Sequence, residues 1–231
     1  MDRSGSKMIS QTEKSRRVGI LGGTFNPIHL GHLRGAEEAR EALHLDTVCF
    51  VPVAIPPHKS EELEVPPNHR LEFVRLAVKD NPAFSICDVE LRREGKSYSV
   101  ETVRHFHRHY PAGELFFIVG LDAFLEITTW KRYKQLFSLC HFVVLNRPGV
   151  NRRELTDLTP REFWKTFRPG KNADHWVHNP SGHSTYFLSR PFMDISSSEI
   201  RDRIRGGISV RYMMPERVEA YVLEKQFYTG C

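Results

Sequence analysis

The chain has 231 residues, of which 40% are hydrophobic and 26% charged, and it carries a formal net charge of +5. This length supports one substantial hydrophobic core, and no stretch approaches the roughly 18 consecutive apolar residues that a membrane span needs. Since the positive residues are scattered and no basic stripe is interleaved with aromatic residues, we expect a small anionic partner, no nucleic acid and no membrane.

The chain is expected to consist of a disordered leader at 1–16 and a single domain at 17–231, with a polar insertion at 150–184. The leader has no apolar segment of the kind found in secretory signals. An arm over a neighbouring subunit is the alternative interpretation of the leader, and homo-oligomerisation stays open. The four cysteines are widely spaced without a Cys-x-x-Cys pair, which is typical of reduced thiols in the cytoplasm.

From residue 17 onward, apolar runs bounded by turn residues alternate with helical patterns. In chain order the expected elements are a strand at 17–22, a helix at 30–43, a strand at 47–53, a helix at 68–79, a strand at 84–89, a helix at 97–110, strands at 115–120 and 141–146, short helices and loop within 150–184, a strand at 186–189, and helices at 197–205 and 215–227. This alternation predicts an α/β fold, a Rossmann-like doubly wound parallel sheet with helices on both faces and a small C-terminal helical part. Ligands of such sheets bind beyond the carboxyl ends of the strands.

The segment GGTFNPIHLGHL, at 22–33, directly follows the first expected strand. Gly22 and Gly23 allow the backbone to approach a ligand closely. His29 and His32 are three residues apart, so on a helix they share a face, and Gly31 between them leaves space above the helix for something bulky. Because a helix N-terminus attracts anions, the two imidazoles could donate hydrogen bonds to a polyphosphate there.

Other interpretations of this segment fit less well. A zinc site needs a third ligand, and the His-Glu-x-x-His pattern is absent. The segment is neither a Walker loop, because Gly-Lys-Ser/Thr is missing, nor a Gly-x-Gly-x-x-Gly dinucleotide fingerprint.

The whole block resembles the signature of the His-x-Gly-His nucleotidylyltransferases, in particular the bacterial nicotinate mononucleotide adenylyltransferases. Members of that family often carry Asp where this chain has Asn26. Further blocks of similarity follow in order: PPHK at 56–59, SYSVET at 97–102, GLDAF at 120–124, TTWKRY at 128–133, NRPG at 146–149 and ISSSEIRDRI at 195–204. The resemblance covers nearly everything from Arg17 onward, and it is weakest in the insertion and absent from the leader.

The resemblance implies transfer of the adenylyl group of ATP to nicotinate mononucleotide, with Mg²⁺ bound mainly through the ATP phosphates. It implies His29 and His32 as the catalytic residues. The residues expected to bind ATP and its phosphates are Gly22, Gly23, Thr24, Phe25, His58, Lys59, Arg147, Ser197, Ser198 and Arg201. Those expected to bind the mononucleotide are Asn26, Ser99, Asp122 and Trp130, with Trp130 as a wall for the pyridine ring.

Each role has an ordinary structural alternative. By motif alone, Ser196 or Ser197 is the N-cap of a helix, Lys59 is a surface lysine and Trp130 is a core residue. Alternative functions are another adenylyl- or cytidylyltransferase of the superfamily, such as one acting on phosphopantetheine, or a non-catalytic nucleotide-binding protein.

Overall fold

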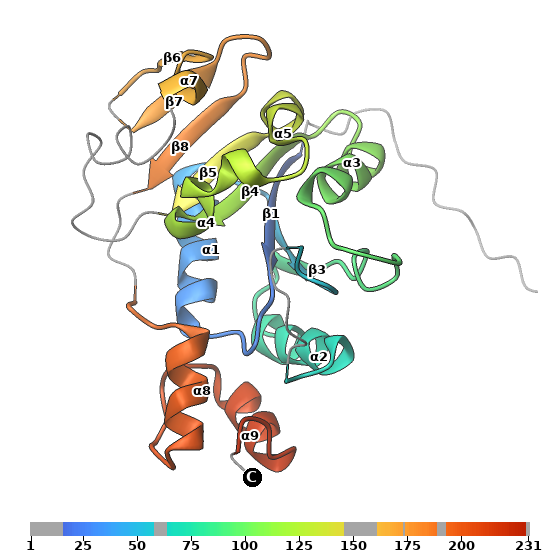
Figure 1. The fold of residues 1–231 in the computed structure, drawn as a ribbon, viewed down its shortest axis with the longest axis vertical. Coiled ribbons are helices and arrows are strands. Elements are labelled where there is room, and N and C mark those ends of the chain that lie inside the picture. The colour runs from blue at the N-terminus through green and yellow to red at the C-terminus, as the bar shows by residue number, and fades with distance from the viewer. Residues whose placement is uncertain (1–15, 58–63, 146–160, 173, 189–192, 230–231) are drawn as a thin grey trace, which may run out of the picture.

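The computed structural model describes residues 16–57, 64–145, 161–172, 174–188 and 193–229, and it is built around one eight-stranded sheet (Figure 1). The strand order is β3-β2-β1-β4-β5-β8-β7-β6. The strands are β1 (Arg17–Gly23), β2 (Thr47–Pro52), β3 (Phe84–Ile86), β4 (Glu114–Gly120), β5 (His141–Leu145), β6 (Phe167–Pro169), β7 (His175–His178) and β8 (Ser184–Leu188). The six strands from β3 to β8 in this order pair in parallel, whereas β7 and β6 are antiparallel.

Helices cover both faces of the sheet, as a doubly wound fold requires. They are α1 (Leu30–Ala42), α2 (Pro67–Val78), α3 (Ser99–His109), α4 (Leu121–Leu125), the short 3-10 helix η1 (Ile127–Thr129), α5 (Tyr133–Leu139), α7 (Arg161–Trp164), α8 (Ser197–Arg205) and α9 (Glu216–Glu224). One core contains buried residues of α3, α4 and α5, and the other contains those of α1, α2, α8 and α9.

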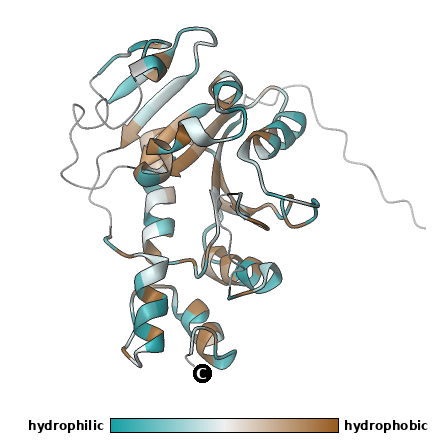
Figure 2. Ribbon diagram, viewed as in Figure 1, coloured by the Kyte–Doolittle hydropathy of each residue, from teal (hydrophilic) through white to brown (hydrophobic). Residues whose placement is uncertain are grey.

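The strand β4 shows why its apolar run is continuous. Leu115 and Phe117 point into the core under α3–α5, whereas Phe116 and Ile118 point into the core under α1 and α2. A strand buried on both faces cannot alternate between apolar and polar residues. The hydropathy colouring accordingly shows apolar strands in the interior and helices with one polar side (Figure 2).

The fold class predicted from the sequence is confirmed, and most element boundaries differ by only one or two residues. The insertion is the main correction. It was expected to hold only short helices and loop, but its described part contains α7 and the strands β6 and β7, which extend the sheet beyond β8. The third strand is also shorter than expected and ends at Ile86. Within the described ranges, no helix is both long and apolar enough to cross a bilayer.

The sheet changes direction of winding between β1 and β4. From β1 the chain proceeds outward to β2 and β3, and it then returns to place β4 on the other side of β1. At such a point the loops after the two strands diverge and leave a crevice at their carboxyl ends. The loop 24–29 after β1 and the segment after β4 therefore meet at this crevice.

We predict that Phe142→Ala lowers the free energy of unfolding by about 3–5 kcal/mol, since it removes a buried aromatic ring and leaves a cavity. Phe142 is fully buried in β5, and its ring stacks on that of Phe137 at a centroid distance of 4.3 Å. Urea denaturation measures the change. The control Leu223→Ala removes a side chain that is 51% exposed, and it should cost less than ~0.5 kcal/mol. Equal effects of the two substitutions would contradict this account of the core.

Candidate active site

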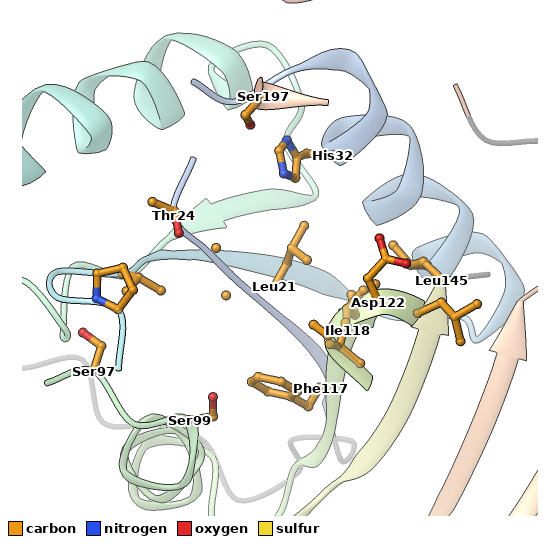
Figure 3. Close-up of a pocket in the computed structure, with 18 of the residues that line it drawn as sticks. Leu21, Thr24, His32, Ser97, Ser99, Phe117, Ile118, Asp122, Leu145 and Ser197 are labelled. Carbon is orange, nitrogen blue, oxygen red and sulfur yellow. The ribbon is translucent and has the colours of Figure 1, made fainter. Parts of the chain in front are cut away.

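A cavity of about 1040 Å³ lies at the carboxyl ends of β1 and β4. Its wall includes the ends of these strands, the first turn of α1, the start of α3, the segment 129–131 and the residues leading into α8. Figure 3 shows Thr24, His32 and Ser197 at one side of this space and Ser97, Ser99 and Phe117 at the other. The cavity is therefore large enough for a ligand that extends from the loop after β1 to the start of α3.

The loop after β1 is held from behind by side chains that are distant in the sequence. The carbonyl oxygen of Thr24 accepts a hydrogen bond from Arg70 at 2.7 Å. The carbonyl of Asn26 accepts from Arg201 at 2.9 Å, and that of Pro27 accepts from the hydroxyl of Ser197 at 2.8 Å. With these three carbonyls hydrogen-bonded to side chains of α2 and α8, the loop is fixed in one conformation.

The rings of His29 and His32 lie against each other at the start of α1, with their planes tilted by 37°. Their ring centroids are 3.7 Å apart, and both side chains line the cavity. His29 is the N-cap residue of α1, and its backbone N–H donates to Nδ1 of His32 at 3.2 Å. Because Nδ1 of His32 is an acceptor, the proton of the neutral ring is on Nε2, which can donate to a ligand.

Burial keeps both imidazoles neutral near pH 7. It lowers the pKa of His29 from its ordinary value of 6.5 to about 4. It also lowers the pKa of His32 well below that value, with a smaller contribution from the neighbouring His29. Nδ1 of His29 has no hydrogen-bond partner in the described structure. A buried ring nitrogen left unpaired costs free energy and is a feature expected at a ligand site.

A side chain at residue 31 would crowd the ring of His29, and glycine avoids this contact. A Cβ atom at residue 31 would lie 3.0 Å from Nδ1 and 3.1 Å from Cε1 of His29. The sequence predicted that Gly31 leaves space above the helix for something bulky. In the structure Gly31 lines the cavity, and the His29 ring lies beside it.

The N-terminus of α8 faces the same loop. Ser196 is its N-cap residue, and its hydroxyl accepts a hydrogen bond from the N–H of Glu199 at 3.1 Å. Ser197 lines the cavity. Ser198 is exposed and accepts a hydrogen bond from Arg201 at 3.1 Å, and neither of these two residues is part of the cavity wall. Arg201 therefore contacts the loop from behind in this structure.

The opposite end of the cavity presents aromatic and polar groups. Trp130 lines it and packs edge-on against Phe117, with ring centroids 6.1 Å apart. Ser99 lines it as well, and the ammonium group of Lys131 lies 3.9 Å from the ring centroid of Tyr98. Asp122 lines the cavity beside Ile118 and Leu145 (Figure 3). A flat ring could stack near Trp130 beside hydroxyl and ammonium groups.

The structure brings together most of the residues that the sequence singled out. The predicted site residues that line the cavity are Gly22, Gly23, Thr24, His29, His32, Ser99, Asp122, Trp130 and Ser197. Phe25 and Asn26 belong to the loop after β1, and their side chains are buried. Phe25 packs against His32, and Asn26 accepts a hydrogen bond from the hydroxyl of Tyr228 at 2.6 Å. The predictions for His58, Lys59 and Arg147 fall outside the described residues.

Three residues near the site were missed by the sequence analysis. Arg70 and Tyr228 hold the loop after β1, and Glu90 lines the cavity beside α3. Burial raises the pKa of Glu90, although hydrogen bonds from Thr102 and Ser97 act in the opposite direction. No local pattern marks these residues, because each acts through contacts between segments far apart in the chain.

A doubly wound sheet with His-x-Gly-His at its switch point defines a nucleotide-binding α/β protein of the nucleotidylyltransferase class. The model of the cytidylyltransferase-like family matches residues 20–203. Relatives named "Probable nicotinate-nucleotide adenylyltransferase" from Geotalea daltonii and Geobacter metallireducens are each 48% identical, over 92% of this chain and 98% of theirs. The chain thus belongs to the cytidylyltransferase-like family and, within it, to the nicotinate-nucleotide adenylyltransferases.

Solved structures agree with this fold. The nicotinic acid mononucleotide adenylyltransferase of Plasmodium falciparum, complexed with NaAD, superimposes with a TM-score of 0.70. The match covers 92% of this chain and 97% of that one at 15% sequence identity. At this identity the likeness supports the fold, whereas the family rests on the closer relatives.

We predict that His29 makes folding stability depend on pH. Its folded-state pKa of about 4 lies below the ordinary value of 6.5, so the unfolded chain binds a proton that the folded protein excludes. The resulting stability is fully present above pH 6.5 and is lost as pH falls toward 4, at a scale on the order of 3 kcal/mol. Urea denaturation of His29→Asn should therefore show a smaller loss between pH 7 and pH 4.5 than the wild-type protein. Identical losses would contradict the burial of a neutral His29.

Proposed function

We propose that this chain transfers the adenylyl group of ATP to nicotinate mononucleotide, forming nicotinate adenine dinucleotide and pyrophosphate in NAD biosynthesis. The observation that carries the proposal is the pair of neutral imidazoles at the start of α1, which lines a cavity of about 1040 Å³. The family membership established above agrees with this reaction.

The nucleophile is the 5′-phosphate of the mononucleotide, which attacks the α-phosphorus of ATP. A phosphate monoester has a second pKa of about 6, so it is largely dianionic at neutral pH and needs no general base. The new P–O bond forms as the bond from the α-phosphorus to the bridging oxygen breaks, and that oxygen leaves with pyrophosphate. Catalysis then depends on aligning two anions and stabilising the charge on the reacting oxygens.

The histidines act as hydrogen-bond donors to these oxygens. Nδ1 of His32 accepts the N–H of His29, so Nε2 carries the proton and is proposed to donate to the ligand, and the adjacent ring of His29 is proposed to supply a second N–H. Gly22, Gly23 and Thr24 let the triphosphate approach the backbone, and Ser197 contributes at the N-terminus of α8. Donors that are fixed before the substrate binds stabilise developing charge without the cost of reorientation.

Other phosphate ligands are proposed from the family resemblance. His58, Lys59 and Arg147 are proposed to approach the triphosphate from the loops after β2 and β5. Ser198 and Arg201 are proposed to assist, with Arg201 acting through the loop that it holds at the carbonyl of Asn26. Phe25 contributes by packing beneath His32, where the two ring centroids lie 5.2 Å apart.

The mononucleotide is proposed to bind at the Trp130 end of the cavity. Trp130 offers an aromatic surface for the pyridine ring, and Ser99 offers a hydroxyl to its substituent. Asp122 lies in the first turn of α4, two residues after β4, and is proposed to accept from ribose hydroxyls. Asn26 is proposed to act from below the loop, where it is fixed by Tyr228.

Magnesium is proposed to enter the site with ATP. The described residues contain no group of three or more His, Cys, Asp or Glu arranged to hold a metal, so phosphate oxygens and water are the expected ligands. When bound, the ion neutralises part of the triphosphate charge. We also propose a cytoplasmic location and a partner set of small nucleotides without nucleic acid.

A pyrophosphate-release assay tests the proposed function. ATP and magnesium are offered with a panel of phosphorylated acceptors that includes nicotinate mononucleotide and phosphopantetheine. We expect the highest kcat/KM with nicotinate mononucleotide. Highest activity with another acceptor would replace the substrate and keep the reaction, whereas no release with any acceptor would refute adenylyl transfer.

We predict that His32→Ala lowers kcat by about two to four orders of magnitude, because it removes a donor that acts on the reacting phosphates. His29→Ala should cost somewhat less. Circular dichroism and urea denaturation check that each variant is folded. A well-folded His32→Ala protein with near-wild-type turnover would be incompatible with the mechanism.

We predict a preference for the acid, nicotinate mononucleotide, over its amide. The backbone N–H of Trp130 already donates to the carbonyl of Ile127 at 3.1 Å, so the ring substituent would meet Ser99 and Lys131. A carboxylate accepts hydrogen bonds from these donors, whereas the NH₂ of an amide would face them without pairing. Each 1.4 kcal/mol of that mismatch lowers kcat/KM for the amide about tenfold. Comparing kcat/KM for both acceptors at equal ATP settles the point. Equal values would refute this account of the pocket and leave adenylyl transfer standing.

A further inference from the structure

Arg70 is a fully buried arginine in the first turns of α2, and it lies behind the cavity wall. Burial lowers its pKa to about 10, so the side chain keeps its positive charge at neutral pH. Among the described residues it forms no ion pair with a carboxylate. Burying a charge without an opposite charge costs free energy, so the charged side chain of Arg70 needs other hydrogen-bond acceptors.

Those partners are four backbone carbonyls. Nη1 donates to Thr24 at 2.7 Å and to Val53 at 2.6 Å. Nη2 donates to Ala54 at 3.0 Å, and Nε donates to Val65 at 3.2 Å. Hydrogen bonds from a charged donor are worth about 1.5–3 kcal/mol each, so together they can offset the cost of burying the charge.

The carbonyls belong to three different segments. Thr24 lies in the loop after β1, Val53 and Ala54 directly follow β2, and Val65 precedes α2. The segment after β2 is also held from its other side, since the N–H of Ala54 donates to the hydroxyl of Ser97 at 3.1 Å. Arg70 therefore joins the loop after β1 to the segment that leads into Pro56 and Pro57, and both of these stretches line the cavity.

The direction of these bonds matters for an anionic ligand. Three carbonyls at the edge of the cavity are turned toward a buried cation that is not itself part of the wall. Their lone pairs are therefore directed away from the place proposed for the triphosphate, and a fixed positive charge lies behind the loop. Both effects favour an anion in front of it.

We propose that Arg70 is a positioning residue for the triphosphate end of the site, which sets the loop after β1 and the segment after β2 in register with each other. This inference rests on the proposed function. The proposal distinguishes the two ends of the cavity, because none of the four hydrogen bonds of Arg70 reaches Ser99 or Trp130. Its removal should impair ATP binding and leave acceptor binding nearly unchanged.

The test compares R70K with R75K, a matched control on the same helix whose side chain is 58% exposed. R70K keeps the charge but loses the planar fork that reaches separate carbonyls. We expect a rise of about tenfold or more in KM for ATP and a similar rise in the Kd of a non-hydrolysable ATP analogue measured by calorimetry. KM for nicotinate mononucleotide should stay within about threefold, and R75K should match the wild-type protein throughout.

A purely structural role would give a different pattern, in which kcat falls with the folded fraction while both KM values are unchanged. That pattern, or equal rises in both KM values, would overturn the proposal. If R70K does not fold, R70Q takes its place, since its amide donates to one carbonyl without burying a charge. Failure of both variants to fold would assign Arg70 to global stability and would also overturn the proposal.

Inactivity of the wild-type protein with every acceptor would instead refute the proposed function, and the calorimetric comparison would still test Arg70.

Discussion

The active site depends on how the backbone carbonyls of the loop after β1 are occupied. Side chains from α2 and α8 donate to the carbonyls of Thr24, Asn26 and Pro27. A loop of this length would otherwise sample many conformations, at a cost of about 1–2 kcal/mol per residue when it is ordered. Because that ordering is completed during folding, the histidines that follow the loop are already in place when a substrate arrives.

This arrangement also sets the chemistry of the two histidines. Their rings lie against each other in a buried position, which lowers the pKa values of both and makes them neutral donors. A neutral N–H can stabilise charge on phosphate oxygens without a large desolvation cost of its own. The doubly wound sheet then provides a crevice at the carboxyl ends of β1 and β4. Trp130 and the two histidines line the same cavity there.

The sequence predicted the parts of this structure that depend on local patterns. The apolar run at 115–120 indicated a buried parallel strand, and the spacing of His29 and His32 predicted that they share a face. The strands β6 and β7 escaped prediction because they are short and extend the sheet through pairing between segments, β7 with β8 and β6 with β7. Arg70 escaped for a similar reason, since its four partners are backbone atoms of other segments and leave no trace in residue types.

The central claim is that His29 and His32 donate hydrogen bonds while the acceptor phosphate attacks the α-phosphorus directly. The stereochemical course at that phosphorus tests this claim most directly. With ATP made chiral by sulfur at the α-phosphorus, a single in-line displacement inverts the configuration. The account predicts inversion in the dinucleotide product. Retention would show two successive displacements, as expected if a histidine formed a covalent adenylyl intermediate, and it would contradict the account.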